Sequence, residues 1–193
     1  MRALALLALA PVALVVVAVP AAAQQTDTAN QRLELLGTAP AACVLGTPKA
    51  ASASNAVFAT TGSSSGQITI SQFVNPQTAN PVASAVSLVL PVTCNASHQI
   101  TVRSANGGLL RAGGNAANRQ RSNAFADFVV YDLGIDWIGR SARQASDRGT
   151  MLVSVNDGGT GEFALRVATP AGGGPLVAGR YDDTIVVEFH AAN

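Results

Sequence analysis

The sequence of 193 residues predicts an all-β protein, an antiparallel sandwich of short strands. Segments in which apolar and polar side chains alternate recur along the chain, and turns rich in Gly, Pro and Asn separate them. Long runs of Glu, Lys and Leu at helical spacing, which helix bundles require, are missing. Both observations favour many short strands over helices.

The alternating segments define six internal strands. In 85–94 ("AVSLVLPVTC"), for example, Val86, Leu88 and Leu90 lie in step on one face. Turn signals such as "GSSSG", "NDGGTG" and "PAGGGP" separate the segments. The predicted strands are 67–73, 85–94, 98–103, 125–133, 150–155 and 162–167.

The chain closes with a further predicted strand in 179–193 ("GRYDDTIVVEFHAAN"). Ile185, Val187 and Phe189 point to one face of this strand, so that face is expected in a core. Only three residues follow His190. We therefore expect no later segment to pair beside this strand, which leaves one of its edges open.

Two polar stretches interrupt the pattern, 111–122 ("RAGGNAANRQRS") and 139–149 ("GRSARQASDRG"). Both are rich in arginine and poor in large apolar side chains, so we predict surface loops, the second with a helical turn. No acidic residue lies between Glu34 and Asp127, whereas 127–193 holds nine. Either the loops meet and neutralise one another in the fold, or the subunit is dipolar and stacks head to tail.

The N-terminus has the features of a secretory signal peptide. After a basic start, residues 3–19 are apolar apart from Pro11, and "AAA" at 21–23 gives a small-residue cleavage pattern. A membrane anchor is the alternative, but Pro11 and Pro20 bracket a stretch too short to span a bilayer comfortably. We expect residues 1–23 to be removed, the protein to be exported, and no insertion into a membrane.

The expected mature chain suits a single domain, because removing 23 residues from 193 leaves 170. Its charges balance at 11 basic and 11 acidic residues, since Arg2 leaves with the signal. A nucleic-acid partner needs a strong basic excess, so none is expected.

Two cysteines, Cys43 and Cys94, lie 51 positions apart. In an exported chain a single disulfide between them is the simplest arrangement. Chain-entropy arithmetic makes such a crosslink worth about 4 kcal/mol. A reactive thiol or metal site is less favoured, because neither cysteine lies in a CxxC pair and no histidine is expected beside them.

Catalytic groups are sparse. The two histidines, His98 and His190, are too few for a three-histidine zinc site, and no GxSxG elbow marks a nucleophile. Asp182 and Asp183 are adjacent, so on a strand they face opposite sides and cannot act as a carboxylate pair. We therefore expect neither an enzyme nor a metal or other cofactor.

Three stretches carry a family resemblance. In "LPVTCNASHQITVRSANGGL" (90–109) a cysteine-ended strand leads into a hairpin, "VVYDLGIDWIG" (129–139) contains spaced Tyr, Leu, Asp and Trp, and "AGRYDDTIVVEF" (178–189) forms the closing strand. Their order resembles the spore coat protein U domain family over most of residues 41–190, and Cys43 and Cys94 sit where the family's first two cysteines would.

The resemblance implies an immunoglobulin-like sandwich that lacks its last strand. The family includes secreted pilins of the archaic chaperone–usher pathway as well as coat and surface proteins. In such pilins a periplasmic chaperone fills the gap first, and the N-terminal extension of the next subunit then replaces it by donor-strand exchange. The expected partners are identical or related subunits, the chaperone and an outer-membrane usher. The expected route leads through the periplasm to the cell surface.

The donor strand is expected in the N-terminal extension, 24–40, ahead of the domain at 41–193. An extended strand in "RLELLGTAPAAC" carries two large and then two small side chains on one face, which could fill a narrowing groove. These donor residues are Leu33, Leu35, Gly37 and Ala39. The expected acceptor groove is lined by Ile185, Val187, Phe189, Val86, Leu88 and Leu90. The alternative is that 31–39 folds back into its own domain, which gives a self-complemented secreted binding or adhesion module.

Overall fold

A computed structural model describes residues 34–192. The expected signal peptide and Leu33 lie outside these residues. The chain divides after Thr38 into two units, and the second, Ala39–Asn193, contains every strand found among the described residues. Its described part holds fourteen strands, a single 3-10 turn at Ser146–Arg148 and no α-helix. The predicted all-β class is therefore confirmed.

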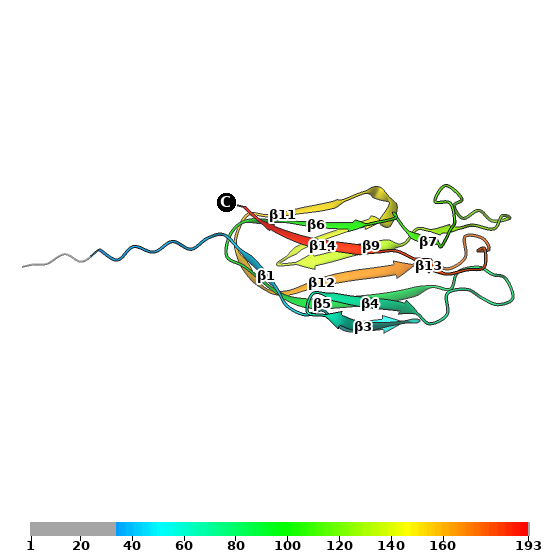
Figure 1. Ribbon diagram of the computed structural model, residues 1–193, viewed down its shortest axis with the longest axis horizontal. Coiled ribbons are helices and arrows are strands. Elements are labelled where there is room, and N and C mark those ends of the chain that lie inside the picture. Colours follow the sequence, from blue (N-terminus) through cyan, green and yellow to red (C-terminus); the bar gives the residue numbers. More distant parts are fainter. Residues whose placement is uncertain (1–33, 193) are drawn as a thin grey trace, which may run out of the picture. The chain divides into compact units, whose positions relative to one another are not determined.

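The larger sheet has six strands, all antiparallel, of which β1, β5, β12 and β9 are labelled in Figure 1. β5 and β12 form its centre and pair along their whole lengths. β1 and β2 pair in succession with the other side of β5, so together they form one edge of the sheet, and β10 forms the opposite edge. The strands are β1 (Cys43–Leu45), β2 (Lys49–Ser54), β5 (Ser84–Cys94), β12 (Gly159–Thr169), β9 (Asp132–Trp137) and β10 (Arg140–Ala145).

A second antiparallel sheet has three strands, with β6 in the middle. They are β11 (Met151–Val155), β6 (His98–Ser104) and β14 (Ile185–Ala191). The inward side chains of both sheets share one hydrophobic core. Val86 and Val92 of β5 are buried, as are Ile100 and Val102 of β6, because side chains two apart on a strand face the same side.

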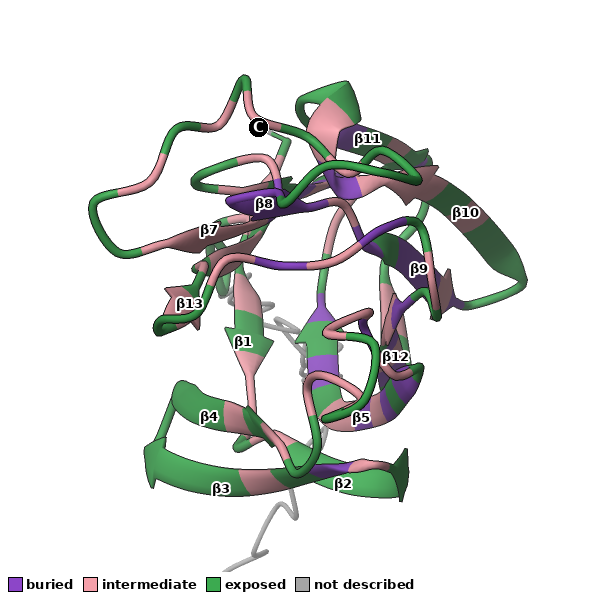
Figure 2. Ribbon diagram, turned by 90° about the vertical axis from the view of Figure 1, so that its right-hand side faces the viewer, coloured by how far each residue is buried: buried purple, intermediate pink, exposed green. Residues whose placement is uncertain are grey.

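Two smaller groups of strands flank these sheets. The hairpin of β3 (Ala56–Gly62) and β4 (Ser65–Ile70) is mostly exposed (Figure 2). At the other group, β7 pairs with both β8 and β13, beside a small apolar cluster of Ala126, Val129 and Leu176. The strands of this group are β7 (Leu109–Arg111), β8 (Phe128–Val129) and β13 (Tyr181–Asp182).

Most predicted strands are present, but two predictions are wrong. The predicted strand 125–133 is split into β8 and β9, because Tyr131 leaves the ladder to hydrogen-bond with Ser146. The predicted loop 139–149 begins instead with the strand β10. β10 lies at an edge and is held by backbone bonds to β9, so it needs no apolar face.

The charged loops neutralise one another locally. Arg119 of the first polar stretch pairs with Asp147 of the second, with 2.7 Å between Nη1 and Oδ2. Arg111 of the first stretch pairs with Asp127, the first acidic residue after Glu34. These pairs favour the first of the two explanations for the uneven charge.

Candidate binding groove

The strand β14 has a partner on one side only. It pairs with β6 from Ile185↔Ser104 to Ala191↔His98, and no strand within residues 34–192 pairs with its other edge. Such an edge presents a row of backbone N–H and C=O groups without ladder partners. β14 therefore offers a place for one more strand.

A cavity of about 880 Å³ lies beside this edge. β5 and β12 line it with apolar side chains, and β14 lines it with Ile185 and Val187. Leu45 of β1, the β1–β2 connection, and Phe58 and Ile68 of the hairpin β3–β4 complete its lining. Its volume falls within the range of about 300–1,000 Å³ that is typical of ligand sites.

Several apolar side chains of this groove are only partly buried. Ile185 and Val187 pack against the core on one side and border the cavity on the other, and so do Leu90 and Val167. By contrast, Ile100 of the neighbouring β6 is fully buried. Covering such apolar surface is favourable in water, so the groove favours association with an apolar strand.

Most predicted acceptor residues line the cavity. These residues are Ile185, Val187, Val86, Leu88 and Leu90. Phe189 does not line it and packs farther along β14, in a cluster of rings. Its ring centroid lies 5.2 Å from that of Phe163 and 6.0 Å from that of Trp137, both close to edge-on. Phe189 therefore fills the core of its own domain.

A carboxylate fixes the start of β14. Asp183 accepts hydrogen bonds from the Tyr131 hydroxyl at 2.8 Å, from the Ser104 hydroxyl and from the backbone N–H of Asn106 at 2.9 Å. Burial raises the pKa of the Tyr131 hydroxyl, and the neighbouring Asp183 carboxylate raises it further. Tyr131 thus stays protonated and donates to Asp183, which holds β14 against β6 at the groove.

The hairpin β3–β4 brings an aromatic side chain to the groove that sequence reasoning missed. The Phe58 ring lies over Gly66 of the facing strand, where a Cβ would come within 2.3 Å of the ring. Only glycine leaves room for the ring there. Within the domain, the strands predicted from alternation begin at residue 67, so β3 was not predicted.

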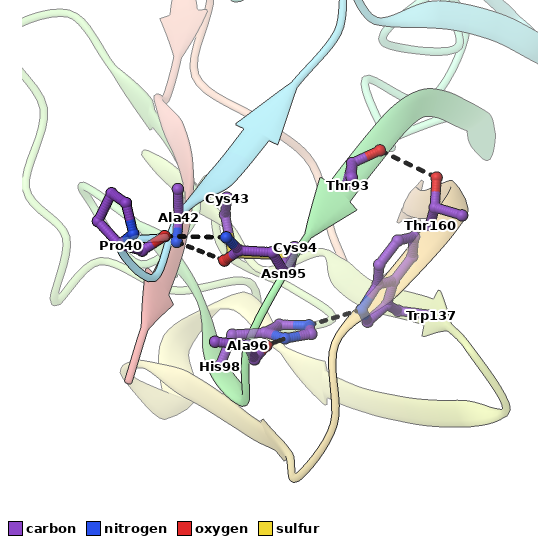
Figure 3. Close-up of a disulfide and its surroundings, with 10 residues drawn as sticks. All are labelled: Pro40, Ala42, Cys43, Thr93, Cys94, Asn95, Ala96, His98, Trp137 and Thr160. Atoms are coloured by element: carbon purple, nitrogen blue, oxygen red, sulfur yellow. Dashed lines mark hydrogen bonds between the residues drawn. A yellow bond between two sulfur atoms is a disulfide. The ribbon is translucent and has the colours of Figure 1, made fainter. Parts of the chain in front are cut away.

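Cys43 and Cys94 form the predicted disulfide (Figure 3), which lies near the last residues of β14, since Ala191 pairs with His98 beside the sulfurs. The two residues are direct partners in the β1–β5 ladder. The next residue, Asn95, holds the chain that enters β1. Its Oδ1 accepts from the Ala42 N–H at 2.7 Å, its Nδ2 donates to the Pro40 carbonyl at 2.8 Å, and its own N–H donates to the Ala42 carbonyl. We call this set of bonds the Asn95 clamp.

A histidine lies beside the disulfide, contrary to the sequence-based expectation. A ring nitrogen of His98 and the two sulfurs lie within 4.8 Å of one another. The sulfurs are bonded to each other, and both His98 nitrogens are engaged: Nε2 accepts from the Trp137 indole at 2.8 Å, and Nδ1 lies 3.0 Å from the Ala96 carbonyl. These groups therefore serve the packing of this end of the domain.

The described donor residues lie in no strand. Leu35, Gly37 and Ala39 are exposed, with Leu35 at 96% and the adjacent Leu36 at 90%. Leu35 and Leu36 therefore leave apolar surface on the extension that contact with another chain could bury.

No family model, curated protein or solved structure matches the chain. Within residues 34–192 no helix is long and apolar enough to cross a membrane.

Proposed function

We propose that the protein is a non-catalytic structural subunit of a secreted surface polymer, a pilus or coat, whose incomplete immunoglobulin-like sandwich is completed by a strand from another subunit. The observation that carries the proposal is the edge of β14, which has no partner strand within residues 34–192 and lies beside a partly exposed apolar groove. An added strand would pair its backbone with this edge and bury its side chains in the groove. Strand addition of this kind is a general mode of recognition.

Residues 33–39 are the proposed donor. Seven residues of extended chain span roughly 23 Å, which matches the seven residues of β14. Leu33 and Leu35 are the large anchors, each worth about 1.5–3 kcal/mol when buried. Gly37 and Ala39 share their face and suit a shallower part of the groove.

Chain direction favours a donor from another subunit. β14 ends near the disulfide, and the chain enters β1 at the same end. Residues 33–39 could therefore lie in their own groove only parallel to β14, after a full reversal at 40–42. The Asn95 clamp holds Pro40 and Ala42 as a continuation of the β1–β5 ladder, which opposes that reversal. A second subunit can supply the strand antiparallel to β14, and antiparallel pairing is slightly the more stable.

In this proposal a periplasmic chaperone covers the groove until an outer-membrane usher brings the next subunit. The disulfide supports an exported protein, because such bonds persist in oxidising compartments. The resemblance of three stretches to the spore coat protein U domain family supports the same route.

The test separates the donor from its neighbours in sequence. The mature wild-type chain, released from a chaperone, should form ladders that resist mild denaturant. L33D/L35D should abolish the ladders and leave the chaperone-bound monomer intact. L36D is the matched control, because Leu36 lies on the opposite face of the extended strand and should tolerate the charge. A peptide spanning 30–40 should bind the groove and yield soluble monomers.

A self-complemented binding module predicts a different result. Its L33D/L35D variant would misfold even as a monomer, because the two leucines would belong to its own core. The wild-type chain would then run as a monomer without any chaperone. Normal ladders from L33D/L35D would show that the donor lies elsewhere.

A further inference from the structure

The turn between β9 and β10 holds a residue that suits it poorly. Trp137 pairs with Arg140, so Ile138 and Gly139 form a two-residue turn. Their φ angles are 39° and 73°, the pattern of a type I′ turn, whose central positions favour Asn and Gly. A β-branched residue with positive φ is an outlier, because its Cβ crowds the backbone.

The side chain of Ile138 is also partly exposed, at 46%. It lies over Gly159, where a Cβ would come within 2.3 Å of the Ile138 Cδ1 atom. Because Gly159 has no side chain, Ile138 can pack on it, while the other side of the Ile138 side chain faces solvent. Residues held in a strained conformation often mark binding sites, because a sequence selected for folding alone would place Asn there.

Ile138 lies at the same end of the domain as the point where the N-terminal extension joins it. Gly159, Cys94 and Cys43 lie in one row on the neighbouring strands β12, β5 and β1. Strands in a sheet lie about 4.8 Å apart, so Ile138 is within roughly 15 Å of the point where the extension joins the domain. Any subunit that takes up the extension comes close to Ile138.

The opposite end of the domain is the surface it would meet. An extension that runs antiparallel to β14 of a second copy emerges where that β14 begins, next to β13. β7 and β13 lie at this end of the domain (Figure 1). β7 also pairs with β8, and Phe125, which is 60% exposed, lies in the loop before β8.

We propose that Ile138 is an apolar contact between successive subunits, and that it packs against the loop end of a second copy of this chain, around Phe125. The inference rests on the proposed function, since it takes its geometry from an inserted extension. It adds a contact outside the groove that orients one subunit on the next.

The experiment compares two readouts in mature chains released from a chaperone: the rate of polymerisation, and capture of a labelled peptide spanning 30–40. I138N should polymerise at least about fivefold more slowly than wild type and capture the peptide equally well, because the peptide carries no domain. Its melting temperature with peptide bound should not fall, since Asn suits the turn. L152N is the matched control, because Leu152 is also a large apolar residue and is 59% exposed, but lies within the strand β11 rather than in the β9–β10 turn. It should behave as wild type.

The variant F125S should show the same defect, and I138N/F125S should polymerise no more slowly than either single variant, since the two residues share one contact. Wild-type polymerisation by I138N, or fully additive defects in the double variant, would overturn the inference. A clear fall in the melting temperature of I138N would also overturn it, because Ile138 would then serve its own fold. If wild-type protein captures no peptide, the proposed function itself fails.

Discussion

Two side chains of β14 point the same way but should have different roles. Phe189 packs among the rings of Trp137, Phe163 and His98, whereas Val187 borders the groove. F189A should therefore destabilise the subunit itself, and V187A should mainly weaken the binding of a donor strand.

The contacts of Phe189 and Val187 determine how much each substitution should change stability and binding. Truncating a core Phe to Ala costs about 3–5 kcal/mol, and the lower end applies because Phe189 is only partly buried. With a urea slope of about 2 kcal/mol per M, the unfolding midpoint of F189A should fall by about 1.5 M. V187A removes two methyl groups that face the groove, so the stability of the free subunit should fall by about 1 kcal/mol. Its affinity for the donor peptide should fall about five- to tenfold.

Urea unfolding followed by tryptophan fluorescence measures the first quantity, and titration with a peptide spanning 30–40 measures the second. H190A is the control for both, because the His190 side chain is 55% exposed and lies 3.8 Å from Glu188 on the outer face. Its stability should change by less than about 0.5 kcal/mol. If F189A weakened peptide binding more than V187A while leaving the urea midpoint unchanged, the division of β14 into a core part and a groove part would be wrong.

Three further predictions concern the disulfide and two carboxylates. Thiol counting under denaturing, non-reducing conditions should find no free thiol, and replacing Cys43 and Cys94 by Ser should lower the free energy of unfolding by about 4 kcal/mol; two free thiols would refute the bond. D183N should cost about 2 kcal/mol in urea unfolding, because an amide nitrogen cannot accept the hydrogen bonds that the carboxylate accepts, and an unchanged midpoint would contradict this role. The hydrogen bond from Arg111 holds the pKa of Asp127 below its ordinary value. The ionised Asp127 therefore stabilises the fold above about pH 4, the ordinary pKa, and this stability is lost as the pH falls through the lower pKa of the folded state. Thermal melts between about pH 5 and pH 2 should lose less stability in D127N than in wild type, and equal losses would count against the pair.

The strands with one buried face could be predicted from sequence. In β5 the buried Val86, Leu88 and Val92 alternate with more exposed residues, and this period of two is visible without a structure. The alternation of Ile185, Val187 and Phe189 predicted β14 in the same way. The disulfide followed from an even number of cysteines in a chain with an apparent export signal.

The remaining strands depend on their neighbours rather than on their own sequence. All six residues of β2 ("KAASAS") are exposed, so no alternation marks it, and it forms because its backbone pairs with β5. β10 is an edge strand of the same kind. The role of Asn95 could not be predicted either, because its hydrogen-bond partners Pro40 and Ala42 lie more than fifty positions away in the sequence. The strain at Ile138 likewise depends on a turn that exists only once β10 has formed.

The disulfide joins Cys43 and Cys94, which are direct partners in the β1–β5 ladder, and it therefore determines how a pulling force would pass through the domain. Tension applied through the N-terminal extension reaches Cys43 and passes through the two sulfurs to Cys94 on the central strand β5. The ladder between β1 and β5 is bypassed, so β1 cannot be peeled from the sheet by a pull on the extension. The bond spans 51 residues, and at about 3.4 Å per residue roughly 170 Å of chain is shielded from stretching. A filament of such subunits would transmit load through its sheet centres, and reduction of the bond would make each subunit extensible.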